Sequence, residues 1–293
     1  MKIFVITKKT LLIIGAALVC IMLALILGVV VSANGTRGET EQTAARPHPT
    51  LSSGPKEGSE GSGLIPSSDC YELQVLAGFK KELPVYSVER NDKRIALTID
   101  AAWDDDKTAF ILETLERYNV KATFFLCGSW VSAYPDMVRA IHDAGHTIGN
   151  HSMTHPHMTK LSGSQILEEM EKLDDLIESI TGERTKLFRA PYGEYDDKVI
   201  LAVRASGREP IQWDVDTIDW KPERSSQTIL DTVLKKLREG SIILCHNNGY
   251  KIEEYLPTLI ETAQANGYEF VKVEELLLPG ETFIDVNGVQ KAK

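Results

Sequence analysis

Short apolar runs rich in β-branched and aromatic residues alternate along this chain with longer segments in which apolar residues recur every three or four positions. The short runs predict strands, and the longer segments predict amphipathic helices. Such alternation is typical of βα units around a parallel sheet. The expected strands are residues 94–99, 122–127, 146–149, 186–188, 210–213, 241–245 and 269–273, and the expected helices are 108–119, 135–145, 164–180, 197–207, 226–240 and 253–267. Seven strands and six intervening helices predict a closed or nearly closed βα barrel.

The pattern at the N-terminus differs, because residues 11–31 form one apolar run without a charged side chain. A helix of this length crosses a hydrocarbon layer of about 30 Å. Three lysines precede the run and no basic cluster directly follows it, which predicts a cytoplasmic N-terminus and an extracellular remainder. Residues 31–33 resemble the cleavage site of a secretory signal, but the run exceeds the usual signal length. We therefore expect an uncleaved single-pass anchor in the cell membrane over residues 1–32.

The rest of the chain divides by composition. Residues 33–69 are rich in Gly, Ser, Thr, Pro and Glu, so they predict a flexible linker that cannot bury a core. Residues 70–280 have the mixture of a single globular domain. Residues 281–293 form a C-terminal tail whose Asn-Gly pair favours a small hairpin.

Charge and cysteine content narrow the function classes. The formal net charge of −10 argues against a nucleic-acid partner, which requires a concentrated basic surface. Of the four cysteines, Cys20 lies in the anchor, Cys70 begins the domain, and Cys127 and Cys245 end strand-like runs. Burial as small apolar side chains is the expected role of the last two, and a disulfide between them stays open. We expect a monomer, although composition leaves the oligomeric state open.

Ionisable side chains follow most of the expected strands. Because the C-terminal ends of barrel strands converge on one mouth, these side chains predict an active site there. One or two of them would be explained as the start of a solvated loop, but a ring of them favours an enzyme. They are Asp100, His151, Arg189, Asp214, Asp216 and His246.

The segment 150–158, NHSMTHPHM, places His151 and His155 four residues apart. Imidazoles at this spacing can converge on one divalent metal, and a catalytic zinc usually has a third protein ligand and an open position for water. In a chain with seven histidines such a pair also arises by chance in solvated loops. By itself the pair is a weak indication of a metal site.

Five ordered motifs together make the chain resemble the polysaccharide deacetylase family, also called the NodB-homology domain or carbohydrate esterase family 4. The resemblance covers about residues 85–275. The membrane anchor and the flanking sequences KATFFLCG and PYG look most like its sporulation-associated Gram-positive branch. The motifs are TID at 98–100, HSMTH at 151–155, RAPYG at 189–193, DVDTIDW at 214–220 and LCH at 244–246.

The resemblance implies a distorted (β/α)7 barrel of the NodB-homology type, preceded by one transmembrane helix, that removes acetyl groups from N-acetylated cell-wall glycans such as peptidoglycan. The implied cofactor is a divalent metal, zinc first and cobalt or nickel as alternatives, bound by His151 and His155. Asp100 matches the catalytic base, and Arg189 is expected to pair with it. The implied oxyanion donor is the backbone N–H of Tyr192.

In the last two motifs, His246 matches the general acid, and Asp216 is expected to hold its ring and raise its pKa. Trp213, Trp220 and Pro191 are candidates for contact with the sugar, although core packing is the commoner role of tryptophan.

The chain departs from the family in the first motif, where the usual metal aspartate is replaced by Ala101. The acidic residues 104–106 follow directly, and Asp105 is our candidate for the third metal ligand. Acidic residues before a helix also act as N-caps, so Asp106 is expected to cap residues 108–119. If neither carboxylate reaches the metal, the chain is instead a weakly active or inactive glycan-binding relative.

Overall fold

The computed structural model describes residues 81–105 and 107–293. The expected anchor (1–32), the linker (33–69), Cys20, Cys70 and Asp106 lie outside the described residues. Among the helices that are described, none combines the length and the apolar character needed to cross a bilayer.

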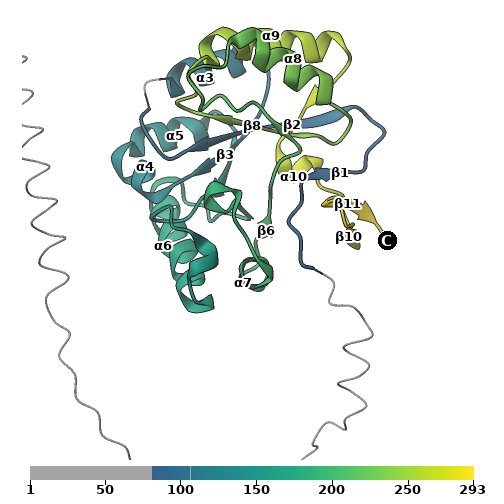
Figure 1. Ribbon diagram of the computed structural model, residues 1–293. Coiled ribbons are helices and arrows are strands. Elements are labelled where there is room, and N and C mark those ends of the chain that lie inside the picture. Colours follow the sequence, from purple (N-terminus) through teal and green to yellow (C-terminus); the bar gives the residue numbers. More distant parts are fainter. Residues whose placement is uncertain (1–80, 106) are drawn as a thin grey trace, which may run out of the picture. The chain divides into compact units, whose positions relative to one another are not determined.

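A parallel sheet forms the centre of the domain (Figure 1). Its strand order is β6-β5-β4-β3-β2-β8-β7, and β9 pairs with the first residues of β2. The register places Asp100 beside His246 on neighbouring strands. The strands are β2 (Arg94–Ala101), β3 (Thr123–Leu126), β4 (Thr147–Asn150), β5 (Leu187–Phe188), β6 (Glu209–Pro210), β7 (Val215–Asp216), β8 (Ile242–His246) and β9 (Glu269–Phe270).

The two edges of this sheet are bridged by the short segment 209–216. At one edge the Ile211 N–H donates to the Phe188 carbonyl (2.8 Å), and three residues later the Asp214 N–H donates to the Ile242 carbonyl (3.2 Å). The strand expected at 210–213 was therefore wrong: two strands of two residues each, β6 and β7, flank a connection that leaves one edge and joins the other. The predicted barrel is confirmed only in part: the parallel strands form a curved α/β half-barrel.

The helices pack around the sheet in the order of its strands (Figure 1). Contacts between neighbours run from α8 to α9, α3, α5, α6 and α7. The six expected helices are confirmed with small shifts, whereas α4 and α10 were not expected. The helices are α3 (Thr108–Arg117), α4 (Gly128–Ala133), α5 (Pro135–Asp143), α6 (Gly163–Thr181), α7 (Asp197–Ala205), α8 (Ser226–Lys236), α9 (Ile252–Ala265) and α10 (Val273–Leu276).

Local chemistry sets the ends of α6, the longest described helix. Ser162 and Gln165 form a reciprocal capping box at its start, which satisfies backbone N–H groups that have no helical partner. Gly182 ends it with a φ of 80°, a conformation that costs glycine little. Both buried cysteines of the core, Cys127 and Cys245, are free thiols, as their apolar surroundings predicted.

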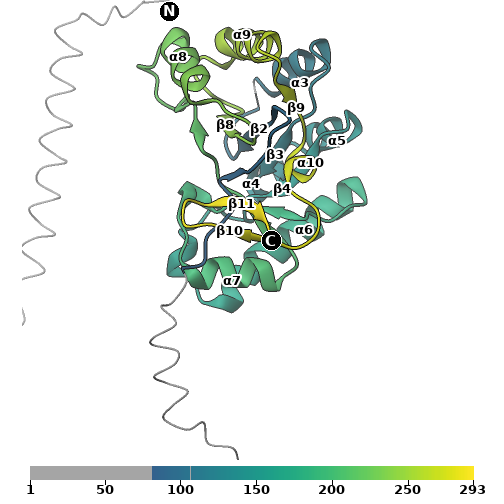
Figure 2. The ribbon, with the colours of Figure 1, turned by 90° about the vertical axis from the view of Figure 1, so that its right-hand side faces the viewer.

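The C-terminal tail forms the expected hairpin. Strands β10 (Thr282–Ile284) and β11 (Val289–Ala292) pair antiparallel, and β11 also pairs parallel with β1 (Ser87–Val88). The three strands form a small sheet, of which Figure 2 shows β10 and β11 beside the main sheet. The tail is therefore paired with the start of the described domain.

Candidate active site

One cavity of about 760 Å³ lies at the C-terminal ends of β2, β4, β7 and β8. Four of the six ionisable residues that the sequence placed at strand ends line it, whereas Arg189 and Asp214 do not. Arg189, Pro191 and Asp105 are not among the lining residues. The predicted site residues that do line it are Asp100, His151, His155, Tyr192, Trp213, Asp216, Trp220 and His246.

The predicted pair of Asp100 and Arg189 is confirmed beneath the cavity. Arg189 is fully buried, and its Nη1 donates to Asp100 Oδ1 at 2.6 Å and to Thr98 Oγ1 at 2.9 Å. Its guanidinium lies over the Phe125 ring, 4.1 Å from the ring centroid. Burial alone would raise the pKa of Asp100, but the positive charge of Arg189 and the two nearby imidazoles His151 and His246 lower it. Asp100 is thus held as a carboxylate.

The two histidines of the second motif lie side by side, with ring centroids 4.9 Å apart. His151 Nδ1 is 2.8 Å from the Arg189 carbonyl, so this nitrogen carries the proton and Nε2 stays unprotonated. That Nε2 lies 3.7 Å from Asp100 Oδ2. Burial lowers the pKa of both histidines, that of His155 to about 4. Both rings are therefore neutral near pH 7, the state in which imidazole binds a metal.

Asp219, and not Asp216, holds the ring of His246. His246 Nδ1 lies 2.7 Å from Asp219 Oδ1, while the His246 N–H and the Tyr255 hydroxyl both donate to Asp219 Oδ2. Burial opposes protonation of His246, but the hydrogen bond to the buried Asp219 carboxylate and its charge outweigh burial and raise the pKa. The expected role of Asp216 is corrected, because its Oδ1 instead accepts the Ile218 N–H at 2.7 Å.

Asp214 and Asp216 have separate surroundings. Asp216 lines the cavity, and burial raises its pKa. Asp214 is half-buried and accepts hydrogen bonds from the Ile242 N–H (2.8 Å) and Ser241 Oγ (3.1 Å). It therefore links β8 to the bridging segment outside the cavity.

Aromatic side chains surround the histidines at the cavity mouth. Tyr192 has a left-handed backbone (φ 60°), and its ring packs against His155 and stacks on His157, with centroids 4.6 Å apart in both cases. Trp213 and Trp220 both line the cavity, and their contact with a sugar stays a prediction. Pro191 is buried outside the lining. Whether the Tyr192 N–H serves as an oxyanion donor stays a prediction.

The histidine pair fits a divalent metal as two nitrogen ligands. His155 Nδ1 is buried and has no hydrogen-bond partner in the structure, which is costly for a ring nitrogen unless a ligand takes it. Within residues 81–105 and 107–293, however, no group of three or more His, Cys, Asp or Glu side chains is arranged to hold a metal. Asp105 is not brought to the two histidines, and its role as third ligand stays a prediction.

The loop after β2 presents Asp104 rather than Asp105 to the cavity. Asp104 has a φ of 50°, and its carbonyl accepts hydrogen bonds from Trp130 Nε1 (2.7 Å) and Asn247 Nδ2 (2.5 Å). These two donors fix the backbone of the acidic loop. The described residue before α3, Lys107, makes no side-chain cap, and the capping role expected of Asp106 lies outside the described residues.

Sequence reasoning missed several residues of the site. Asp219 stood in the fourth motif, but spacing could not tell which of two nearby carboxylates reaches the imidazole. Tyr255 lies in α9, where its apolar neighbours gave no hint that its hydroxyl contacts Asp219. Trp103 and Tyr250 line the cavity and are each 55% exposed. Their position next to motif residues was the only signal for them.

Comparison with known proteins agrees with this geometry. A family model described as polysaccharide deacetylase matches residues 87–211. The peptidoglycan-N-acetylglucosamine deacetylase PgdA of Listeria monocytogenes is 35% identical over 195 residues, which cover 67% of this chain and 41% of PgdA. A peptidoglycan-N-acetylglucosamine deacetylase of Bacillus cereus is 33% identical, with 65% of this chain and 70% of that protein covered. The chain thus spans well under two thirds of PgdA and more of the Bacillus cereus protein.

A solved structure adds a relative of a different kind. Wild-type BA3943 of Bacillus anthracis, described as a CE4 family pseudoenzyme, is 36% identical and superposes with a TM-score of 0.63 over 66% of this chain and 68% of that one. A mutant of it is described as having restored enzymatic activity. The ordered motifs, the cavity at the strand ends and these likenesses lead to one assignment: the chain belongs to the polysaccharide deacetylase family, carbohydrate esterase family 4.

Proposed function

We propose that this protein is a metal-dependent N-deacetylase that hydrolyses the acetamido groups of an N-acetylated cell-wall polysaccharide, peptidoglycan or a related N-acetylhexosamine polymer, outside the cytoplasm. One observation carries the proposal: a carboxylate with a lowered pKa, Asp100, and an imidazole with a raised pKa, His246, face the same cavity from neighbouring strands. Groups whose surroundings push their pKa values apart are suited to act as base and acid in one reaction.

The roles of the two groups follow from their partners. Asp100 is ionised and accepts a proton from the attacking water through its free oxygen, Oδ2, while Arg189 holds Oδ1. His246 is protonated and donates a proton to the nitrogen of the departing sugar amine, while Asp219 accepts its Nδ1–H. The amine leaves as the C–N bond breaks and acetate forms. Each group ends the hydrolysis with the opposite protonation state, and exchange with solvent resets both.

A divalent metal, with zinc first and cobalt or nickel as alternatives, would be held by His151 and His155. When bound there, such an ion would lower the pKa of a water ligand and polarise the acetyl carbonyl. Asp105 remains the proposed third ligand.

The exposed aromatic rings favour a polymeric carbohydrate as the substrate. In the described part of the chain eight large apolar side chains are exposed, and four of them, Trp103, Tyr192, Trp220 and Tyr250, line this one cavity. Exposed apolar groups gathered at one place mark a binding site. Flat aromatic faces pack against the apolar faces of sugar rings, so the rim can hold several residues of a glycan chain.

The proposed location rests on the sequence of residues 1–32, which lie outside the described residues. Their apolar run would anchor the protein in the cell membrane by a single span, with the domain facing the wall.

The test is to incubate the full chain, supplied with zinc or cobalt, with peptidoglycan and with chitin oligomers, and to quantify released acetate and new free amines. The proposal predicts equal amounts of both products. Acetate without a matching amine would come from ester groups and would contradict N-deacetylation.

A second function, glycan binding without turnover, is favoured by Ala101 at the position of the usual metal aspartate and by the absence of a three-ligand group from the described residues. The similarity to a CE4 family pseudoenzyme supports it as well. This alternative predicts that the protein purifies without metal and that His151→Ala still binds glycan. Loss of acetate release in that variant, from an active parent, would exclude it.

A further inference from the structure

The loop that carries His151 and His155 has an unusual backbone at two places. Ser152 has a φ of 64° and His155 a φ of 58°, both in the left-handed region that residues other than glycine rarely adopt. Such residues keep this conformation only where the surrounding contacts impose it. The direction in which the His155 ring points therefore depends on whatever holds the loop.

Two hydrogen bonds hold the two left-handed residues. The Ser152 N–H donates to Asn150 Oδ1 at 2.9 Å, and the His155 N–H donates to Ser152 Oγ at 3.0 Å. The first bond ends at the amide oxygen of Asn150, and a reoriented amide would present NH2 to the Ser152 N–H and break it. The second bond depends on it only indirectly, because its acceptor is the hydroxyl of the residue that the first bond holds. The orientation of the Asn150 side chain therefore bears on the backbone of Ser152 and, through the Ser152 hydroxyl, on that of His155.

The orientation of that amide is set by α6. Asn150 Nδ2 donates to Asp174 Oδ1 at 2.7 Å and to the Met170 carbonyl at 2.9 Å, and Asn150 and Asp174 are fully buried. Both partners are acceptors, so they can be satisfied only by the NH2 end of the amide. The oxygen end must then face Ser152.

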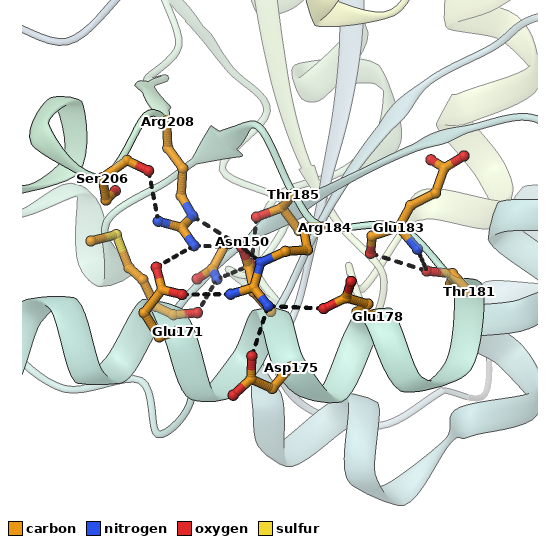
Figure 3. A network of polar contacts seen from close by, with 12 residues as sticks. Asn150, Glu171, Asp175, Glu178, Thr181, Glu183, Arg184, Thr185, Ser206 and Arg208 are labelled. Carbon is orange, nitrogen blue, oxygen red and sulfur yellow. Dashed lines mark hydrogen bonds and ion pairs between the residues drawn. The ribbon is translucent and has the colours of Figure 1, made fainter.

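Asp174 is itself fixed by donors from two other segments, and Figure 3 shows these donors, Thr185 and Arg208, together with Asn150. Thr185 Oγ1 donates to its Oδ1 at 2.6 Å, and Arg208 donates to its Oδ2 through Nε (3.1 Å) and Nη2 (2.5 Å). Arg208 Nη2 also donates to the more exposed Glu171 at 2.7 Å. Both oxygens of the buried Asp174 carboxylate therefore accept hydrogen bonds. None of these residues lines the cavity.

We propose that Asp174 is a positioning residue for the histidine loop, acting through Asn150 to hold Ser152 and His155 in their left-handed conformations and so to aim the His155 ring into the cavity. The proposal rests on the proposed function in one respect, namely that His151 and His155 serve the reaction. The hydrogen-bonded path itself does not depend on which reaction this is.

The experiment uses three variants of the full chain. Asp174→Asn and Asn150→Ala cut the same link from its two ends, and Asn150→Ala leaves the buried pair of Asp174 and Arg208 intact should the first variant fail to fold. Glu171→Gln is the matched control, because it removes another α6 partner of Arg208 without touching the loop.

The first readout is residue-resolved amide hydrogen exchange together with the NMR signals of the His155 ring at neutral pH. Asp174→Asn and Asn150→Ala are expected to speed exchange of the Ser152 and His155 amides by about tenfold or more relative to the rest of the domain. The ring signals of His155 should shift in both variants and stay unchanged in Glu171→Gln.

The second readout is turnover. In an active parent, kcat is expected to fall by about 10–100-fold in both variants with KM little changed, since outer contacts of this kind orient reacting groups. Exchange that rises equally throughout α6 and β4, or ring signals that match the parent, would overturn the proposal. A parent that releases no acetate would refute the proposed function, while exchange and NMR would still decide the role of Asp174.

Discussion

At the scale of single residues, the site depends on partners that motif spacing could not assign. The expectation that Arg189 pairs with Asp100, which came from the resemblance to the deacetylase family, is confirmed. The sequence wrongly predicted that Asp216 is the hydrogen-bond partner of the His246 ring. Asp216 and Asp219 are three residues apart, and the turn between them, with Ile218 at a φ of 52°, brings the second carboxylate back to the imidazole.

This arrangement predicts the pH dependence of turnover. The pKa of His246 is raised, so the protonated acid persists to higher pH and the rate should fall only as pH rises through that pKa. Asp219→Asn removes the charge that, with its hydrogen bond, raises the pKa of His246 most, so the falling limb of kcat should move to lower pH with a lower maximum. The measurement is the pH profile of kcat for the parent, Asp219→Asn and Asp216→Asn. A larger shift in Asp216→Asn than in Asp219→Asn would contradict the assignment.

A second prediction concerns stability and His146, which lies outside the cavity. Burial, with Lys121 and Lys272 nearby, lowers its pKa from 6.5 to about 4, and its Nδ1 accepts the Ala122 N–H. At a pH between these two pKa values, His146 is protonated in the unfolded chain but not in the folded protein. The free energy of unfolding should therefore fall as pH falls from about 6.5 towards 4.

The check is urea unfolding of the parent and His146→Asn across this range. The asparagine oxygen can accept the same N–H but does not titrate, so the variant should show a shallower loss of stability on acidification. An identical pH dependence in both proteins would show that His146 is not responsible.

At the scale of elements, length decided what could be predicted. Helices of nine or more residues, such as α6 and α9, carry enough apolar repeats to be recognised. The elements that were missed or displaced, α4, α10, β6 and β7, have two to six residues each and exist because of contacts with distant parts of the chain. Those short elements include the bridging segment that carries Asp216 to the cavity.

One turn between elements gives a sharp prediction. Gly240 precedes β8, the strand that ends at His246, and has a φ of 77°; a Cβ there would lie 1.7 Å from the Val88 carbonyl oxygen. Backbone cannot move aside cheaply, so Gly240→Ala should lower the free energy of unfolding by about 2–4 kcal/mol. Gly182 has a similar φ of 80° with open space around it, and Gly182→Ala should cost only about 1–2 kcal/mol.

Equilibrium unfolding of both alanine variants measures this difference. Equal losses would mean that the left-handed backbone alone, rather than the contact between Gly240 and β1, accounts for the cost.

At the scale of the whole molecule, the βα alternation predicted the class of fold and the cavity at its strand ends. It could not predict that the curved sheet is bridged by a single connecting segment, because hydrogen bonds between distant residues determine that feature. Nor could it place the acidic loop, whose backbone is fixed by Trp130 and Asn247. The third ligand of the proposed metal site is the least predictable part for this reason.

The central claim is that Asp100 is the base of an N-deacetylase, and the most direct measurement is acetate release from peptidoglycan by the zinc- or cobalt-supplied full chain beside Asp100→Asn. Asp214→Asn is the matched control, since it changes a partly buried carboxylate of the bridging segment that does not line the cavity. We expect release by the parent and the control and a loss of at least about 100-fold in Asp100→Asn with the fold retained. Unchanged release in Asp100→Asn, or a metal-loaded parent that releases none, would contradict it.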